Sequence, residues 1–515
     1  MNGAQSVVQT LLGSGVDVCF ANPGTSEMHF VAALDGPGER KMRAILGLFE
    51  GVVTGMADGY ARLAGRPAAT LLHLGPGFGN GWANVHNARR AGSPVVNIVG
   101  DHATYHLQYD APLTSDVAAL ARTVSGWVHT TTHARNAAAD TARAVQAAMQ
   151  FPRQIATLIL PADAAWSPAE RPAPPLPVAG PATVSDDAVA AVADALRHGR
   201  RTAILLAGAA LDEDGLATAG RIAAATGARL LCDTFTPRLA RGAGRVPIER
   251  IPYFAEQIVA TMADVEQLVL VGAKPPVAFF AYPDKPSTGL PPGAEVVVLS
   301  HPHEDGKAAL AALADALGAT AVDMVVADHR TDGSTSGKFD QFGIGRILAA
   351  HLPEGAVVVD EAATCGLGAQ IALVTAAPHD ALSLMGGSIG QGLPLATGAA
   401  VAAPDRKVVC LHGDGGAMYT LQALWTQARE RLDVTTVVYA NRRYSILDIE
   451  LQRVGATGTE SAARLFDLGD PELNWVDMAR GMGVEAVRVH DLVGLSDAFA
   501  VAMRERGPRL IEVMV

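Results

Sequence analysis

The sequence is poor in aromatic and charged residues. Aromatic residues make up 5% of the 515 residues and charged residues 18%, whereas hydrophobic residues make up 49%. Such a composition excludes a disordered, solvated chain and predicts buried cores. The scarcity of aromatic residues, together with 53 glycines and 30 prolines, fits short turns between strands and helices better than a β-sandwich.

Basic residues are also in short supply. The 40 lysines and arginines are outnumbered by 52 aspartates and glutamates, which gives a formal net charge of −12 at pH 7. No long basic run offsets this balance, so we expect no extended surface for the phosphates of nucleic acid. The sequence therefore favours small molecules as partners.

Cysteine is rare and scattered, which excludes a disulfide framework or a zinc ribbon. The cysteines are Cys19, Cys232, Cys365 and Cys410. The first residues hold no basic segment followed by an apolar run, so we expect no secretory signal and a cytoplasmic protein. The uncharged stretch from Ala381 to Pro404 is long enough to span a bilayer, but it is rich in glycine. We expect it to form a buried loop and helix, and we expect no membrane association.

The length predicts roughly three domains of about 150 residues each. Two stretches have the composition of linkers: a proline-rich one from Ser167 to Ser185 and a polar one from His329 to Asp340. We therefore predict an N-terminal domain at residues 1–166, a central domain at residues 186–328 and a C-terminal domain at residues 341–515.

Each predicted domain alternates short apolar runs with longer helical patterns, which is typical of parallel α/β sheets. The expected strands are Val16–Phe20, Ala69–Leu74, Val95–Val99, Ala203–Leu206, Leu230–Cys232, Leu268–Val271, Glu295–Leu299, Val357–Val359, Val408–Leu411, Val434–Tyr439 and Leu510–Val513. The expected helices are Glu50–Leu63, Gly215–Ala225, Lys307–Leu317 and one from about residue 418 to 431. The predicted fold class is α/β with three doubly wound parallel sheets, whose ligands bind at the carboxyl ends of strands.

Polar residues follow two consecutive expected strands of the C-terminal domain. Gly413, Asp414, Gly415 and Gly416 follow the first of these strands, and Asn441 follows the second. A carboxylate, an amide oxygen and a backbone carbonyl form an oxygen set that Mg²⁺ accepts while phosphate oxygens and water complete its octahedron. The glycines let the backbone approach a diphosphate. A simple turn is the alternative for Gly-Asp-Gly alone, but the strand-to-helix context and the matched Asn441 favour a metal site.

This pattern resembles the thiamine diphosphate motif, in which Gly-Asp-Gly is followed further along by Asn-Asn. The resemblance implies thiamine diphosphate and Mg²⁺ as cofactors, with Asp414, Asn441 and the carbonyl of Arg443 as metal ligands. The sequence departs from the motif at Ala440, where the first asparagine is usual. Ile389 is similar to the aliphatic wedge under the thiazolium ring, with an ordinary core isoleucine as the alternative. The resemblance implies cofactor contacts also for Gly387, Ser388, Gly413, Gly415, Gly416, Tyr444, Ser445 and Ile446.

The run from Leu48 to Arg62 has a helical period and carries Glu50 at its start. The pattern alone favours a first-turn glutamate stabilised by the helix dipole. The run is similar, however, to the segment that supplies the catalytic carboxylate in the pyruvate oxidase and decarboxylase branch of thiamine enzymes. This resemblance implies that Glu50 contacts the pyrimidine ring of the cofactor. It also implies a pyrimidine-binding N-terminal domain, a diphosphate-binding C-terminal domain, and a cofactor shared between two chains in a homodimer or a dimer of dimers.

Two N-terminal segments are expected to face the substrate. The segment from Asn22 to Glu27 resembles one of benzoylformate decarboxylase, which implies that the hydroxyl of Thr25 binds the substrate carboxylate. A helix N-cap at Thr25 or Ser26 is the alternative. His73 ends an expected strand, and the resemblance implies a catalytic histidine that moves protons, with a structural histidine as the alternative.

Other positions depart from the relatives. Ala281 stands where benzoylformate decarboxylase has a second catalytic histidine, so that proton relay is not expected here. His102 and His106 are candidates to replace it, although solvent-facing loop histidines are the simpler interpretation. Pyruvate decarboxylases require a glutamate at Leu447, and its absence argues against their chemistry.

The central domain resembles the flavin-binding domain of acetohydroxyacid synthases and related oxidases. Its glycines at Gly208 and Gly272 do not form a convincing nucleotide loop. We therefore expect a structural role for this domain and no FAD.

The resemblance as a whole implies a lyase that uses Mg²⁺ and thiamine diphosphate to decarboxylate a small 2-oxo acid to an aldehyde. The main alternative is a transferase of the acetolactate synthase type, which condenses two 2-oxo acids. A non-catalytic homologue is a third interpretation, and the presence of Glu50, Asp414 and Asn441 counts against it.

Overall fold

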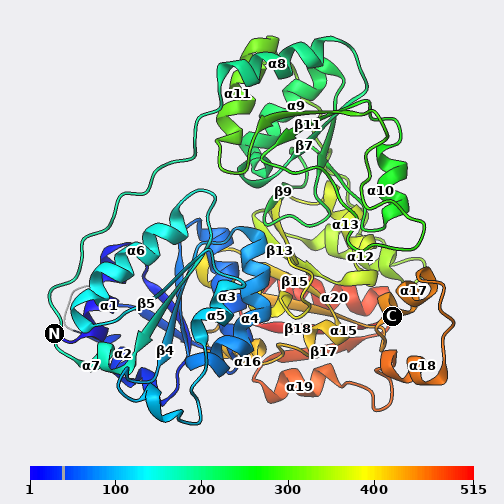
Figure 1. Cartoon of the computed structure of the whole chain (residues 1–515). Helices are drawn as coiled ribbons and strands as arrows, with labels where there is room; N and C mark the ends of the chain where they lie inside the picture. The colour runs from blue at the N-terminus through cyan, green and yellow to red at the C-terminus, as the bar shows by residue number, and fades with distance from the viewer. Residues whose placement is uncertain (37–40) are drawn as a thin grey trace.

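The computed structural model describes residues 1–36 and 41–515, which form three sheets with helices on their faces (Figure 1). Nearly all strand pairs are parallel, so the predicted α/β fold of doubly wound sheets is confirmed. Every strand expected from the sequence is present, with ends shifted by two residues or fewer. The apolar runs form these strands because a parallel sheet is covered by helices on both faces.

The first sheet has the strand order β2-β1-β3-β4-β6-β5. Its strands are β1 (Val18–Asn22), β2 (Arg43–Leu46), β3 (Ala68–Leu72), β4 (Val95–Asp101), β5 (Trp127–Thr130) and β6 (Ile155–Pro161). Its helices are α1 (Gly3–Gly13), α2 (Met28–Ala33), α3 (Glu50–Ala64), α4 (Leu74–Ala91), α5 (Val117–Arg122), α6 (Ala137–Met149) and α7 (Ala162–Trp166). From α7, the proline-rich stretch from Ser167 to Ser185 runs along the outside of the molecule to the middle sheet (Figure 1).

The middle sheet has the strand order β10-β8-β7-β11-β12. Its strands are β7 (Thr202–Leu206), β8 (Arg229–Cys232), β10 (Glu249–Arg250), β11 (Gln267–Val271) and β12 (Glu295–Ser300). Its helices are α8 (Asp186–Arg197), α9 (Glu213–Thr226), α10 (Ala255–Met262) and α11 (Gly306–Leu317).

The third sheet has the strand order β17-β18-β16-β15-β13-β14-β9. Its strands are β13 (Ala356–Glu361), β14 (His379–Ser383), β15 (Val408–Gly413), β16 (Val434–Ala440), β17 (Glu485–Val489), β18 (Arg509–Met514) and β9 (Leu239–Arg241). Its helices are α12 (Gln341–His351), α13 (Leu367–Ala372), α14 (Gly392–Ala402), α15 (Asp414–Ala417), α16 (Ala423–Arg429), α17 (Ser445–Arg453), α18 (Glu460–Phe466), α19 (Trp475–Gly481) and α20 (Leu492–Arg504).

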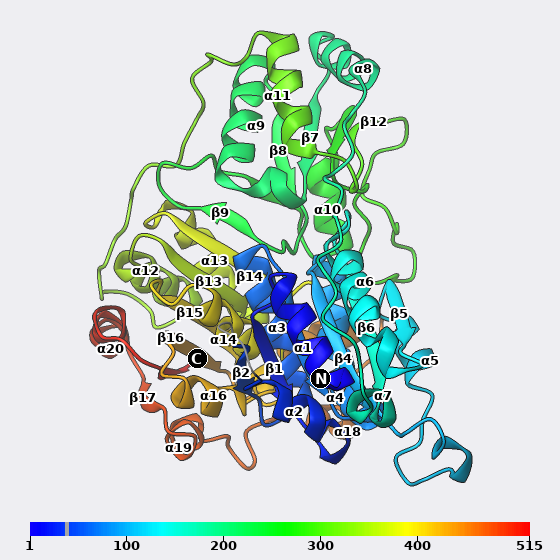
Figure 2. The ribbon, with the colours of Figure 1, turned by 90° about the vertical axis from the view of Figure 1, so that its left-hand side faces the viewer.

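Strand β9 belongs by sequence to the middle part of the chain but pairs antiparallel with β14 of the third sheet. Figure 2 shows it between the middle sheet and the third sheet. The division of the chain into domains at residues 1–166, 186–328 and 341–515 stays a prediction.

One expected helix is wrong in part. The sequence predicts a single helix from about residue 418 to 431, but within this range the structure has only the short helix α16, preceded by turns from residue 418 to 422. Within these turns, the hydroxyl of Thr420 donates a hydrogen bond of 2.8 Å to the carbonyl of Gly390. This hydrogen bond joins the turns to the loop of residues 386–391.

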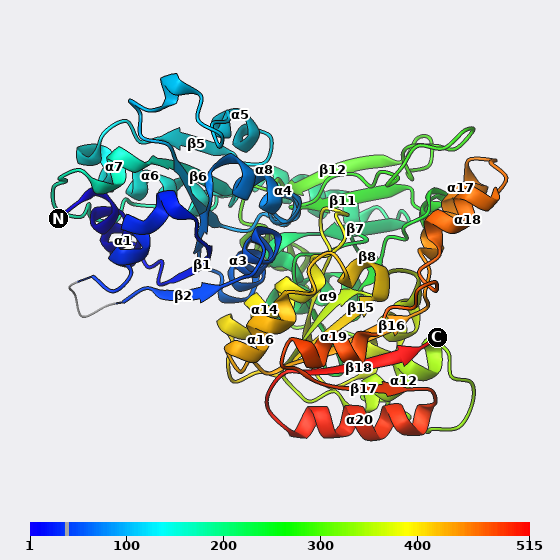
Figure 3. The same ribbon diagram turned by 90° about the horizontal axis from the view of Figure 1, so that it is seen from below.

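The first and third sheets share one hydrophobic core. Helices α3 and α14 pack against each other between the two sheets (Figure 3). The contact is close because both helices carry glycine: a Cβ at Gly398 would lie 1.9 Å from the carbonyl oxygen of Met56, and one at Gly59 2.0 Å from that of Leu395.

The uncharged stretch from Ala381 to Pro404 supplies β14 and α14, and the helix is buried over most of its length, as expected for a core element. Within the described residues, no helix combines the length and the apolar character needed to cross a membrane.

Candidate active site

Two of the predicted metal ligands lie at the carboxyl ends of neighbouring parallel strands. Asp414 follows β15 and Asn441 follows β16, and the two strands pair from Val408 to Gly413. The backbone N–H of Arg442 donates a hydrogen bond of 2.7 Å to Asp414 Oδ2, so the two strand ends are directly linked. Asp414 is only 3% exposed, and burial raises the pKa of its carboxyl group. A divalent cation beside this carboxylate would stabilise its charged form.

The residues after Asn441 lie beside Gly415. Tyr444 Oη donates a hydrogen bond of 3.3 Å to the Gly415 carbonyl, and a Cβ at Gly415 would lie 2.3 Å from the Tyr444 ring. Ser445 begins α17 and accepts a hydrogen bond of 3.2 Å from Asn441 Nδ2. Arg443 is exposed, and its side chain pairs with Asp448.

The predicted wedge Ile389 lies in the loop of residues 386–391, which connects β14 to α14. Ile389 is half-buried and does not belong to the buried cores. Helix α4 holds this loop, because Asn87 Nδ2 donates a hydrogen bond of 2.8 Å to the carbonyl of Ser388. Gly387 lies against the ring of Phe279, which a Cβ at this glycine would meet at 2.6 Å.

Glu50 is the first residue of α3, as the helical pattern predicts, and is 9% exposed. Its Oε2 accepts a hydrogen bond of 3.0 Å from Asn80 Nδ2 on α4. Asn84 Nδ2, one turn further along α4, donates a hydrogen bond of 2.8 Å to the carbonyl of Gly51 and lies 3.5 Å from the carbonyl of Gly390. The start of α3 and the 386–391 loop therefore approach each other within one chain.

His73 precedes α4 and pairs with a carboxylate that the sequence reasoning missed. Its Nδ1 lies 2.9 Å from Oε2 of Glu27, which is almost fully buried. The Ser26 hydroxyl donates to Glu27 Oε1 at 2.6 Å and caps no helix. Thr25 is exposed and caps no helix either, so the N-cap alternative is wrong for both residues. Glu27 directly follows the small or polar residues Gly24, Thr25 and Ser26, so the sequence does not predict that Glu27 is buried.

Glu50 and His73 both lie beside Gly77. A Cβ at Gly77 would lie 3.0 Å from Glu50 Oε1 and 3.2 Å from His73 Cβ. His102 and His106 follow β4, where His106 is exposed and His102 is half-buried. Their rings contact each other, with centroids 5.6 Å apart.

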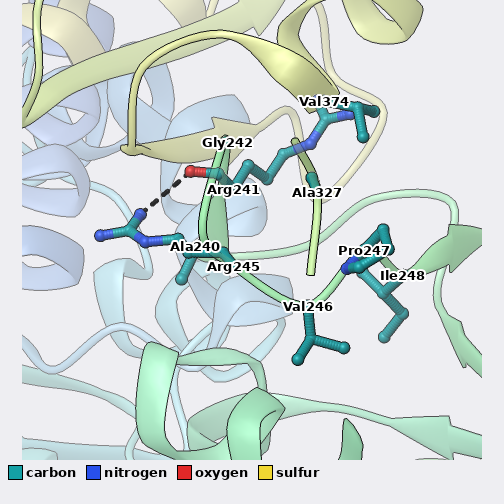
Figure 4. Close-up of a pocket in the computed structure, with 9 residues that line it drawn as sticks. All are labelled: Ala240, Arg241, Gly242, Arg245, Val246, Pro247, Ile248, Ala327 and Val374. Carbon is teal, nitrogen blue, oxygen red and sulfur yellow. Dashed lines mark hydrogen bonds between the residues drawn. The ribbon is translucent and has the colours of Figure 1, made fainter. Parts of the chain in front are cut away.

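A small cavity lies elsewhere, beside β9 and the segment after it (Figure 4). It is lined in part by Arg241 and Arg245, and burial lowers the pKa of Arg241 to about 9. Its volume of about 10 Å³ is the space of roughly one water molecule. This cavity is too small for a cofactor, and none of the predicted site residues lines it.

The donor set fits the predicted cofactors. Across the described residues no cluster of three or more His, Cys, Asp or Glu side chains could hold a metal ion. A Mg²⁺ bound through a diphosphate needs no such cluster, because a carboxylate, an amide and backbone or phosphate oxygens are sufficient. The buried carboxylate of Asp414 and the glycine backbone beside it provide such a place.

Two family descriptions match the chain. "Thiamine pyrophosphate enzyme, N-terminal TPP binding domain" matches residues 1–131, and "Thiamine pyrophosphate enzyme, C-terminal TPP binding domain" matches residues 364–513. The chain belongs to the thiamine pyrophosphate enzymes. The predicted family and the prediction of a thiamine diphosphate enzyme are thereby confirmed.

Individual thiamine pyrophosphate enzymes resemble the whole chain. A protein of Mycobacterium tuberculosis (strain ATCC 25618 / H37Rv) named "Putative acetolactate synthase large subunit IlvX" is 54% identical over 100% of this chain and 99% of its own length. Benzoylformate decarboxylase of Pseudomonas aeruginosa is 29% identical over 97% of this chain and 96% of its own. The structure of Rhodococcus jostii RHA1 thiamine diphosphate-dependent 4-hydroxybenzoylformate decarboxylase matches in fold, with a TM-score of 0.85 at 22% identity, over 100% of this chain and 99% of that chain.

Proposed function

We propose that this thiamine diphosphate enzyme binds Mg²⁺ and cleaves the carboxyl group from a 2-oxo acid, releasing CO₂ and an aldehyde. The observation that carries the proposal is the pairing of His73 with the buried Glu27, near Gly77, which also lies beside the Glu50 carboxylate. An aldehyde forms only when a carbon atom gains a proton after CO₂ has left, and a histidine held by a carboxylate is suited to deliver it. The proposal includes no flavin.

In this proposal Asp414, Asn441 and the carbonyl of Arg443 hold Mg²⁺, and the backbone from Gly413 to Gly416 approaches the diphosphate. Bound thiamine diphosphate supplies a carbon nucleophile for the 2-oxo group and accepts the electron pair left by CO₂. Glu50 holds and exchanges a proton with the pyrimidine ring. Its burial and its hydrogen bond from Asn80 keep the carboxylate in one orientation.

The hydroxyl of Thr25 and the imidazole of His73 serve the substrate. The Thr25 side chain is exposed and free to donate a hydrogen bond to a carboxylate. Glu27 accepts from His73 Nδ1, which leaves Nε2 to exchange protons with the substrate.

Carboligation of the acetolactate synthase type is the second candidate function, favoured by the name of the relative that is 54% identical. Incubation with single 2-oxo acids, aliphatic and aromatic, separates the candidates when products are identified by chromatography and CO₂ is measured. We expect one aldehyde for each CO₂ released. Acetolactate from pyruvate without aldehyde would overturn the decarboxylase proposal, and no product with any 2-oxo acid would favour the non-catalytic homologue.

We further propose a homodimer, or a dimer of dimers, in which two chains share each cofactor. Its support is the presence of the predicted pyrimidine and diphosphate residues on different sheets, together with exposed aromatic side chains at Tyr105, Tyr109 and Tyr419. Co-expression of Glu50→Gln and Asp414→Ala chains tests this arrangement. If sites are shared, hybrid dimers contain one intact site, and about a quarter of the wild-type activity is expected from random pairing. Complete inactivity of a dimeric mixture would contradict shared sites.

We propose a cytoplasmic location. The support is chemical: Cys19, Cys232 and Cys410 are buried free thiols, and burial raises the pKa of each. Such cysteines are typical of proteins kept in a reducing compartment. Fractionation of cells that produce the protein would test this location, and recovery outside the cytoplasm would contradict it.

A further inference from the structure

The buried carboxylate of Glu361 accepts hydrogen bonds at the end of the 386–391 loop. Glu361 is the last residue of β13 and is 6% exposed. Its Oε1 accepts a hydrogen bond of 2.6 Å from the N–H of Gly390, and its Oε2 accepts one of 2.6 Å from the N–H of Gly392. Both oxygens of one side chain therefore fix the backbone that follows Ile389.

The second contact of Glu361 is with the start of a helix. Gly392 is the first residue of α14, whose first N–H groups have no partner within the helix. A carboxylate at this position satisfies one of these groups and is stabilised by the helix dipole. In the described part of the chain, no lysine or arginine lies within ion-pair distance of Glu361. The hydrogen-bond donors to its carboxylate are therefore the backbone N–H groups of Gly390 and Gly392.

Glu361 also contacts β15, the strand that Asp414 follows. The ring of His412, on β15, is fully buried, and its Nε2 lies 3.5 Å from Glu361 Oε2. A Cβ at Gly416 would lie 3.0 Å from the His412 ring and 3.2 Å from Glu361 Oε1. Glu361 therefore touches the loop of Ile389 on one side and the segment Gly413 to Gly416 on the other.

We propose that Glu361 is a positioning residue that fixes the 386–391 loop relative to the Gly413 to Gly416 segment, and that cofactor affinity depends on this contact. The proposal rests on the proposed function, in which the Gly413 to Gly416 segment approaches the diphosphate, and on the resemblance that places Ile389 under the thiazolium ring. Hydrogen bonds to a charged acceptor are about twice as strong as neutral ones, so one carboxylate with two backbone donors constrains the loop strongly.

The variant Glu361→Gln tests the proposal. Glutamine offers one carbonyl oxygen, so its NH₂ group must face one of the two backbone N–H groups, and the loop loses one anchor. We expect thiamine diphosphate to bind about 10- to 100-fold more weakly to the apoprotein at fixed Mg²⁺. This factor corresponds to the free energy of one hydrogen bond to a charged group. Calorimetric titration measures this affinity. Turnover at saturating cofactor should change much less, because Glu361 does not touch the substrate.

The matched control is Asp433→Asn. Asp433 is another buried carboxylate of the third sheet, paired with Lys407 at the opposite end of the strands. We expect this variant to lower the unfolding midpoint but to leave cofactor affinity unchanged. Glu361→Asp keeps the charge but is too short to reach both N–H groups, so weaker binding is also expected if the glutamine variant does not fold.

Two results would overturn the proposal. The first is wild-type cofactor affinity in Glu361→Gln. The second is wild-type cofactor affinity in Glu361→Asp, with an unfolding midpoint lowered as in Asp433→Asn. Failure of the proposed function is a separate result, because the wild-type protein would then show no turnover of 2-oxo acids. Binding of thiamine diphosphate by the wild-type protein is measured in the same titrations.

Discussion

Glu50→Gln is expected to lower the rate of CO₂ release by a factor of about 10² to 10⁴, the usual contribution of a proton-transferring group. Glutamine has the same shape, and its carbonyl oxygen can still accept the hydrogen bond from Asn80, so the fold should persist. The amide cannot take up a proton, however, and the exchange with the pyrimidine ring is lost. Initial rates with a saturating 2-oxo acid and saturating cofactor measure the effect.

The control for this variant is Glu249→Gln. Glu249 belongs to the middle sheet, where its exposed carboxylate pairs with Arg229. This substitution removes one charge of the same kind without touching the site, so wild-type rates are expected. If Glu50→Gln retained wild-type turnover, the catalytic role of Glu50 would be refuted.

Asp414→Ala is expected to weaken Mg²⁺-dependent binding of thiamine diphosphate by on the order of 100-fold or more. Loss of a residue that only hydrogen-bonds to a metal ligand already lowers metal affinity about 10- to 100-fold, and Asp414 is proposed as a ligand itself. Burial raises the pKa of the Asp414 carboxyl group, and Mg²⁺ is the cation proposed to stabilise its charged form. Titration of the apoprotein with cofactor, at several Mg²⁺ concentrations, measures the loss. Activity should fall in parallel and recover only in part at high Mg²⁺.

Asp497→Ala is the control for the metal site. Asp497 is exposed on α20, a helix of the third sheet. Its substitution removes one negative charge without changing the carboxyl ends of β15 and β16. Its affinity for cofactor should equal that of the wild type. Equal affinities of Asp414→Ala and wild type at every Mg²⁺ concentration would remove Asp414 from the proposed ligand set.

The sequence allowed the strands of the three sheets to be predicted because apolar runs in parallel sheets are nearly continuous. It also allowed Asp414 and Asn441 to be placed together, since consecutive parallel strands with a helix between them usually lie side by side. Glu27, Asn80 and Glu361 were not predicted, because each acts on residues far away in the chain. The turns between α15 and α16 were not predicted either, and Thr420 within them contacts the distant carbonyl of Gly390.

Strand β9 has a consequence for any attempt to isolate the C-terminal part of the chain. It covers one edge of β14, whose N–H and C=O groups would otherwise be unpaired along that side. Such an open edge is a template for pairing with another chain. A fragment that starts at residue 341 would lack β9, so it should self-associate even though every residue of its own core is present. The middle part of the chain thus protects the third sheet from aggregation.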